Sequence, residues 1–361
     1  MRQADVVGGV PLRPAGPVVR GLFAALTKVA VPLVDRSRRQ TGVRFEEWVG
    51  LRPHATSRRW GWVHYGIFLP SLPEPLRYLN TMTLIGLPGA RIFDHDELVG
   101  HDARRLATLM TSTAAPGQHL IHGYDVLDDC SFADDGSTLR WGDELVVALA
   151  PGRATLTGRY GTFDVDLEIE ITQQASWFIR TPFYRHLSLL SHVRGVVAGH
   201  PIDTLGTFEY ARSVSPQSLR ARPFPEGWKL PADFFTYQIV NIDPETQVLF
   251  AEVRAAGQVA TRTGFLRTAN GESRSFDDVT FEVLEYGEPL TGPQGTLMRM
   301  PLRQAITVRD RGVPVIRLEG TIDSDWRSGH GRGYVAAWTY AGEVRGRAVA
   351  GSGYIEWVDL T

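Results

Sequence analysis

Two short stretches near the end of the chain decide its fold: Val344-Arg345-Gly346 and Gly353-Tyr354-Ile355-Glu356-Trp357. The same pattern occurs earlier, as Val193-Arg194-Gly195 followed by Gly206-Thr207-Phe208-Glu209-Tyr210. Each copy reads Val-Arg-Gly, a spacer, then Gly, two residues, Glu and an aromatic residue. The spacers differ in length, which a loop accommodates at little entropic cost. The repetition predicts a duplicated β-domain whose halves end in the same strand pair, with chance similarity between two β-rich segments as the alternative.

Short apolar segments separated by turn signals continue along most of the chain. Residues 164–171 alternate strictly between acidic and apolar side chains, as expected for a strand with one buried face. Asp134-Asp135-Gly136 and Pro151-Gly152 are hairpin-type turns. Many short strands joined by tight turns indicate barrels or sandwiches. We predict a basic N-terminal segment, a first β-domain, a Pro-rich linker and a second β-domain, at residues 1–54, 55–212, 213–233 and 234–361.

The size and charge of the chain exclude several classes of protein. A chain of 361 residues is long enough for about two domains, and a net charge of −2 argues against general nucleic-acid binding. The single cysteine, Cys130, excludes an internal disulfide framework and fits a reducing compartment. We therefore expect a cytoplasmic protein.

The N-terminal segment carries a concentration of positive charge. Residues 1–60 contain ten Arg and Lys28 against four acidic residues, about +7. Residues 18–31 predict a short helix with a narrow polar stripe. Two roles are open for this helix: packing on its own barrel, or peripheral contact with a membrane.

The repeated strand pair, the linker and the closing Gly-Tyr-Ile-Glu-Trp resemble those of two-domain lipocalin-like proteins. This family includes hydroxyneurosporene synthase, which is a carotenoid hydratase, and fungal Diels–Alder-type cyclases. The resemblance implies a mainly β fold of two tandem antiparallel lipocalin-like β-barrels, with an apolar substrate inside a barrel or between the barrels. It favours Glu209 in the first half, and Tyr354 with Glu356 in the second, as site residues.

Other candidate residues come from the chemistry of their neighbours. One predicted loop, at residues 323–330, contains Asp323, Asp325, Trp326 and His330. A carboxylic acid beside a tryptophan can be desolvated, and its raised pKa would suit it to protonate an alkene; a solvated polar loop is the alternative. His64 and His186 lie in apolar runs. Each is either a hydrogen-bonded core residue or, if it faces a cavity, a candidate acid or base. Aromatic residues could line a cavity or fill a core: Trp60, Trp62, Tyr65, Trp177, Tyr184 and Trp338.

The repeated glutamates also have a structural interpretation. The equally repeated Arg194 and Arg345 are candidates to donate hydrogen bonds to Glu209 and Glu356. Catalysis by at least one of the glutamates is the other possibility.

These features together predict an enzyme that binds an apolar isoprenoid- or polyketide-like molecule. Its reaction would be a hydration, dehydration, isomerisation or cyclisation by acid/base chemistry, without a cofactor or a metal. The alternative is a non-catalytic carrier of a lipid or another hydrophobic ligand. A carrier needs only an apolar cavity, whereas the enzyme also needs a buried acid or imidazole facing the ligand.

Overall fold

The computed structural model describes residues 31–292 and 295–361. The predicted helix at residues 18–31 lies outside this part, except for Val31. Two short helices begin the described chain, α2 (Val31–Val34) and α3 (Ser37–Gln40). None of the described helices has the length and apolar character needed to cross a membrane.

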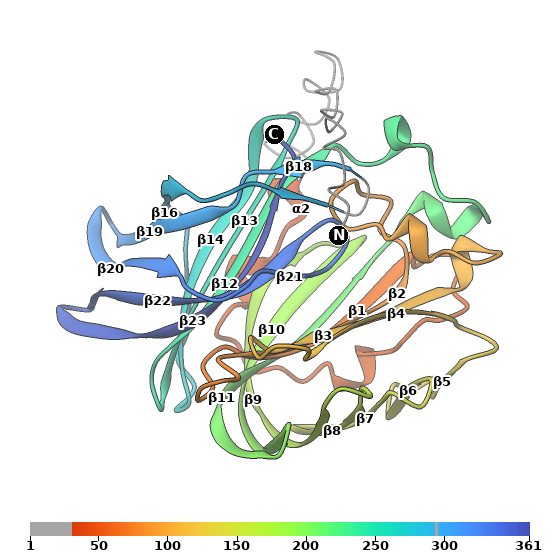
Figure 1. The fold of residues 1–361 in the computed structure, drawn as a ribbon, viewed down its shortest axis with the longest axis horizontal. Helices are drawn as coiled ribbons and strands as arrows, with labels where there is room; N and C mark the ends of the chain where they lie inside the picture. The colour runs from red at the N-terminus through yellow and green to blue at the C-terminus, as the bar shows by residue number, and fades with distance from the viewer. Residues whose placement is uncertain (1–30, 293–294) are drawn as a thin grey trace, which may run out of the picture.

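The first half forms one antiparallel sheet of eleven strands. Their order is β4-β3-β2-β1-β11-β10-β9-β8-β7-β6-β5, so the last strand returns to pair with the first (Figure 1). The strands are β1 (Trp62–Leu69), β2 (Leu79–Gly86), β3 (Leu106–Ser112), β4 (His119–Asp125), β5 (Cys130–Phe132), β6 (Thr138–Trp141), β7 (Leu145–Ala150), β8 (Arg153–Arg159), β9 (Asp164–Arg180), β10 (Tyr184–Val197) and β11 (His200–Ser213).

The second half forms a ten-stranded sheet in which the last strand again pairs with the first. Its order is β15-β14-β13-β12-β23-β22-β20-β19-β16, with β21 paired to β22. Its strands are β12 (Ala232–Asp243), β13 (Thr246–Ala255), β14 (Gln258–Thr268), β15 (Ser273–Phe276), β16 (Asp278–Tyr286), β19 (Pro301–Asp310), β20 (Val313–Ile322), β21 (Arg327–Ser328), β22 (Tyr334–Val344) and β23 (Arg347–Asp359). β17 (Leu290–Thr291) and β18 (Leu297–Met298) form a separate pair.

Both copies of the repeated pattern close a sheet. The first copy lies on β10 and β11, and the second lies on β22 and β23. β11 pairs with β1 and β23 pairs with β12, so each sheet curls back on its own first strand. The predicted fold of two tandem antiparallel barrels is therefore confirmed. The linker connects β11 to β12. The domain boundaries at residues 213–233, and the origin of the two halves by duplication, remain predictions.

The buried apolar side chains of the described residues form three large cores, one in each barrel and one between the barrels, and a fourth, small cluster. On β1, Tyr65 and Ile67 point into the interior of the first barrel, whereas Phe68 points away from it. Phe68 packs between the barrels with Tyr78, Tyr237 and Tyr354. Each large apolar side chain that is fully buried contributes roughly 1.5–3 kcal/mol to stability. The third core therefore holds the barrels together and surrounds the polar groups described next.

A buried ion pair attaches the linker to the first barrel. Lys229 Nζ lies 3.0 Å from Asp94 Oδ2, and each side chain is 1% exposed. Asp94 Oδ1 accepts hydrogen bonds from the backbone N–H groups of Gly89 and Ala90. These contacts give the buried carboxylate a cation and two donors, which a charge in this environment requires.

Candidate active site

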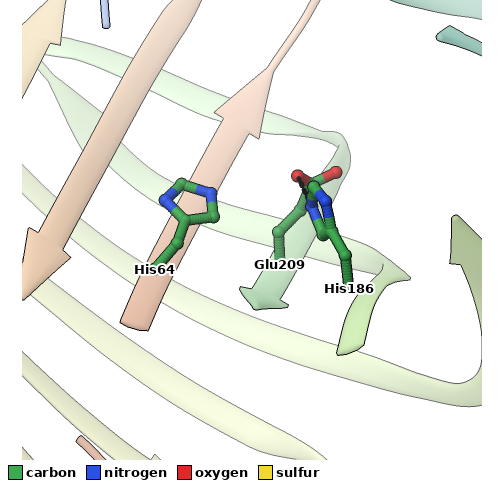
Figure 2. A group of neighbouring side chains, drawn as sticks. All are labelled: His64, His186 and Glu209. Carbon is green, nitrogen blue, oxygen red and sulfur yellow. Dashed lines mark hydrogen bonds and ion pairs between the residues drawn. The ribbon is translucent and has the colours of Figure 1, made fainter. Parts of the chain in front are cut away.

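Three neighbouring strands of the first barrel, β1, β11 and β10, carry successive rows of side chains on one face. Figure 2 shows three of these side chains, His64, Glu209 and His186, close to one another. In an antiparallel sheet, paired residues point to the same face, and the same face recurs every second residue. The rows on this face are the outer row Trp62–Ser213–Tyr184, the histidine row His64–Ala211–His186 and the glutamate row Gly66–Glu209–Ser188. The register of β1, β11 and β10 thus brings together residues that are far apart in the sequence.

Glu209 is the centre of the cluster and is only 2% exposed. One carboxylate oxygen, Oε1, accepts a hydrogen bond from the Tyr237 hydroxyl of the second barrel. The other, Oε2, lies 3.4 Å from His186 Nε2. Burial alone would raise the pKa of Glu209, but the hydrogen bonds and charge of His186, and the hydroxyl of Tyr237, lower it below its usual value. Glu209 is therefore an ionised carboxylate at neutral pH.

His64 is held in a single tautomer. Its Nδ1 lies 2.9 Å from the carbonyl oxygen of Thr83. A carbonyl oxygen can only accept, so Nδ1 carries the hydrogen and Nε2 has a free lone pair in the neutral ring. Burial, followed by the charge of nearby His186, lowers the pKa of His64 to about 4. His64 is therefore a neutral acceptor at neutral pH.

Gly66 leaves the space that the His64 ring needs. A Cβ atom at this position would lie 2.8 Å from His64 Nε2 and 2.6 Å from the Phe68 ring. Contacts this short force side chains out of their preferred rotamers. The absence of a side chain at Gly66 therefore sets the position of the imidazole beside Glu209.

Gly66→Ala is expected to destabilise the fold by about 1–3 kcal/mol, because the added methyl group overpacks this site. Urea unfolding of the variant measures the loss. Gly100→Ala is the matched control, since a Cβ at Gly100 meets no atom within 4 Å. Equal stability of Gly66→Ala and wild type would contradict the described position of His64.

Glu356 supplies a second buried carboxyl from the other barrel. It lies on β23 directly opposite Tyr237 of β12, the residue that donates to Glu209. The Tyr354 hydroxyl donates to its Oε1 at 3.1 Å. Burial, and then the negative charge of Glu209, raise the pKa of Glu356 to about 8. Glu356 is therefore a protonated acid at neutral pH, whereas Glu209 is ionised.

Aromatic rings surround this group of acids and bases. The Phe178 ring lies 4.7 Å from His186 and 5.7 Å from Tyr237, measured between centroids. Phe68 lies 5.6 Å from Tyr354. Such faces provide apolar contact and can stabilise a positive charge.

The cluster reaches solvent at one end. The His186 side chain is 22% exposed, while that of Glu209 is 2% exposed. Trp62 and Tyr184 of the outer row are half-buried, with ring centroids 5.7 Å apart. Two surface hollows, one beside Arg194 and the other beside His54, lie elsewhere on the first barrel. His186, Trp62 and Tyr184 therefore mark the end of the cluster that is nearest to solvent.

His64, His186 and Glu209 could also hold a metal ion. Their ligand atoms all lie within 4.8 Å of one another. Two imidazoles and a carboxylate suit zinc or iron(II). Both oxygens of Glu209 already have partners in Tyr237 and His186. A metal ion bound by these three residues would take the place of the contact between Glu209 and His186.

The two acids of the predicted loop at residues 323–330 do not join this cluster. His330, at the end of the loop, lies closer to it: burial, and then the charges of His95 and His64, hold the pKa of His330 well below its usual value. Asp323 is exposed and pairs with Arg77 at 2.7 Å, and the Asp325 side chain is 79% exposed. Solvent keeps both acids hydrated, so neither is the desolvated acid that the sequence suggested. Trp326 packs on the core of the second barrel, and His330 stacks on His95 with ring centroids 5.7 Å apart.

Four of the aromatic residues expected to line the ligand site also lie elsewhere. Tyr65 and Trp177 belong to the interior core of the first barrel, and Trp338 belongs to that of the second. Trp60 is half-buried before β1, and the guanidinium of Arg212 lies 4.5 Å from the centroid of its ring. The reason is strand parity: Tyr65 follows His64 directly and so points to the opposite face.

The repeated arginines are not partners of the repeated glutamates. Arg194 pairs with Asp203 at 3.2 Å, and Arg345 pairs with Glu272. Both arginines lie near hairpin ends and are exposed. The glutamates lie farther along the closing strands, where the partners are Tyr237, His186 and Tyr354. Sequence reasoning missed Tyr237, whose only signal was its place in the apolar run that opens the second domain.

The chain belongs to a family of proteins defined by sequence. Residues 82–361 match the family of unknown function DUF6670, so the chain is a member of that family. No curated protein matches the sequence significantly.

Two solved structures are similar to most of the chain. Kievitone hydratase from Nectria haematococca is 11% identical, with a TM-score of 0.55, over 90% of this chain and 97% of that chain. CghA, solved with Sch210972, is 10% identical, with a TM-score of 0.45, over 84% of this chain and 89% of that chain. At 11% identity, the likeness to kievitone hydratase establishes the fold alone.

Proposed function

We propose that this protein is an enzyme that performs acid/base chemistry on an apolar isoprenoid- or polyketide-like molecule bound between its two barrels. One observation carries the proposal. Two buried carboxyl groups in one cluster have pKa values shifted in opposite directions, with Glu356 protonated and Glu209 ionised. Environments that separate two pKa values in this way define an acid and a base in enzyme sites.

The acid and the base have complementary tasks. Glu356 transfers its proton to an alkene carbon or a carbonyl oxygen of the substrate, which leaves a carbocation or its oxygen-stabilised equivalent. Glu209, assisted by His186, takes one proton from an attacking water in a hydration, or from a neighbouring carbon in an isomerisation or cyclisation. One proton is given and one is taken, so exchange with solvent restores both groups.

The surrounding side chains support this chemistry. The faces of Phe178 and Tyr237 lie beside the acids and would stabilise a cationic intermediate. The neutral Nε2 of His64 would orient a water molecule or a hydroxyl group. The shared fold with kievitone hydratase and the resemblance to hydroxyneurosporene synthase are consistent with a hydratase- or cyclase-type reaction.

A non-catalytic carrier is the competing function. A carrier would be served by apolar walls alone, and burying a charge is costly. The described interface instead buries two carboxyls together with His64 and a half-buried His186. This arrangement favours the enzyme.

The test uses the molecule that the protein itself selects. Apolar compounds are extracted from purified Glu209→Gln protein, in which turnover is blocked, and are then incubated with wild type. Mass spectrometry should detect an isomer, or a product that has gained or lost one water. Repeating the incubation with a chelator tests the metal alternative, and conversion should persist. An extracted compound that wild type leaves unchanged would support the carrier instead.

A further inference from the structure

Arg267 is a buried cation without a carboxylate partner. It lies on β14 of the second barrel, is 1% exposed, and has no acidic side chain within ion-pair distance in the described part of the chain. Its hydrogen bonds go to neutral oxygens only. Nη1 donates to Ser188 Oγ at 2.8 Å, Nη2 donates to Thr207 Oγ1 at 2.7 Å, and Nε donates to Gln247 Oε1 at 3.0 Å.

The partners of Arg267 are themselves fixed. Ser188, Thr207 and Gln247 are each no more than 1% exposed. Thr207 donates to Gln247 Oε1 at 3.1 Å, and the Gln247 amide donates to Asn241 at 2.8 Å. The guanidinium has five N–H groups, and four hydrogen bonds to described residues are formed. One N–H of Nη1 is therefore left over in a rigid, water-poor setting.

The position of Arg267 connects it to the candidate active site. Ser188 is the member of the glutamate row that pairs directly with Glu209, and Thr207 is two residues from Glu209 on β11. Burial lowers the pKa of Arg267 to about 10, and the negative charge of Glu209 opposes this shift, so Arg267 remains protonated at neutral pH. The two carboxylate oxygens of Glu209 contact Tyr237 and His186, and neither is hydrogen-bonded to Arg267.

A buried charge with neutral partners is costly, and the cost is offset when an anion arrives. We infer that Arg267 binds an anionic oxygen of the substrate, so that the substrate is an apolar molecule carrying a carboxylate, enolate or phenolate group. This inference rests on the proposed function and narrows it. A plain hydrocarbon would leave the remaining N–H of Nη1 without an acceptor, whereas an anionic oxygen of a polyketide-like molecule would accept a hydrogen bond from it.

The test compares two fluorescent probes that share one aromatic skeleton. 1-Anilinonaphthalene-8-sulfonate carries an anionic group, and N-phenyl-1-naphthylamine lacks it. Wild type should bind the sulfonate about 10–100-fold more tightly than the neutral probe, because one charge-assisted hydrogen bond changes an affinity by about this factor. Arg267→Met should remove this preference and leave the affinity for the neutral probe unchanged. Arg267→Lys keeps a cation and should retain part of the preference.

Arg345→Met is the matched control, because Arg345 is exposed and pairs with Glu272. It should bind both probes as wild type does. Melting curves establish which variants are folded. If Arg267→Met is unfolded, the relative affinities of wild type and Arg267→Lys for the two probes still test the inference. Equal binding of the two probes by wild type, or an unchanged preference in folded Arg267→Met, overturns the inference. Because the assay needs no turnover, this failure would leave the catalytic role of Glu209 standing.

Discussion

Glu209→Gln is expected to lower conversion of the extracted substrate by about 10²–10⁴-fold, the usual contribution of a positioned acid or base. Glutamine preserves the shape of the side chain but cannot take a proton. It also weakens the hydrogen bonds from Tyr237 and His186, which lose an ionised acceptor. The free energy of unfolding should therefore fall by about 1–3 kcal/mol, which leaves a folded protein in which activity can be measured.

The matched control for this variant is Asp325→Asn, which makes the same kind of change at an exposed carboxyl. Its activity should equal that of wild type, and its stability should change by no more than about 0.5 kcal/mol. Full activity in Glu209→Gln would remove this residue from the catalytic group. Loss of activity in Asp325→Asn instead would move the site to the loop at residues 323–330.

Glu356→Gln is expected to remove a large pH dependence of stability. The pKa of Glu356 is about 8 in the folded protein against an ordinary value of 4.5. Between these values the folded state holds a proton that the unfolded state has released, so stability falls as the pH rises. Below about 4.5 both states are protonated and the contribution is fully present; above about 8 it is lost. The expected loss is roughly 3–5 kcal/mol, since each pKa unit is worth about 1.4 kcal/mol.

Urea unfolding of wild type and Glu356→Gln across this pH range measures the difference. The variant has no proton to lose at this position, so it should gain stability relative to wild type as the pH rises. The same substitution should reduce conversion by about 10²–10⁴-fold, because it removes the proposed acid. A constant difference in unfolding free energy at all pH values would show that Glu356 is not a protonated acid in the folded state.

The closing strands of both barrels could be predicted from the sequence, because the repeated pattern combines a turn, a strand and a buried polar residue. Glu209 and Glu356 could be singled out for the same reason. The hydrogen-bond partners of these two glutamates could not be predicted. Tyr237 meets Glu209 only through contact between two barrels that are not joined by strand pairing, and no local pattern encodes such a contact. Arg267 was missed because an arginine in an alternating strand usually predicts a solvent-facing position.

The aromatic residues show a second limit. Trp62, His64 and Tyr65 lie in one run, yet the first two face the second barrel and Tyr65 faces the interior of the first. A shift of one residue exchanges the two faces of a strand. When both faces of a strand are buried, the sequence carries no polar alternation that would reveal which face is which. For this reason the sequence leaves open whether Trp177 and Trp338 line a ligand site or fill a core.

The central claim is that one buried cluster holds a protonated Glu356 beside an ionised Glu209. Infrared difference spectroscopy of wild type against each glutamine variant tests it without a substrate, because a protonated carboxylic acid and a carboxylate absorb at different frequencies. At neutral pH, Glu356→Gln should remove a protonated carboxyl band, and Glu209→Gln should remove a carboxylate band. The protonated band of wild type should disappear as the pH rises through about 8. Two carboxylate bands at neutral pH, or a protonated band that disappears with Glu209→Gln, would contradict the account.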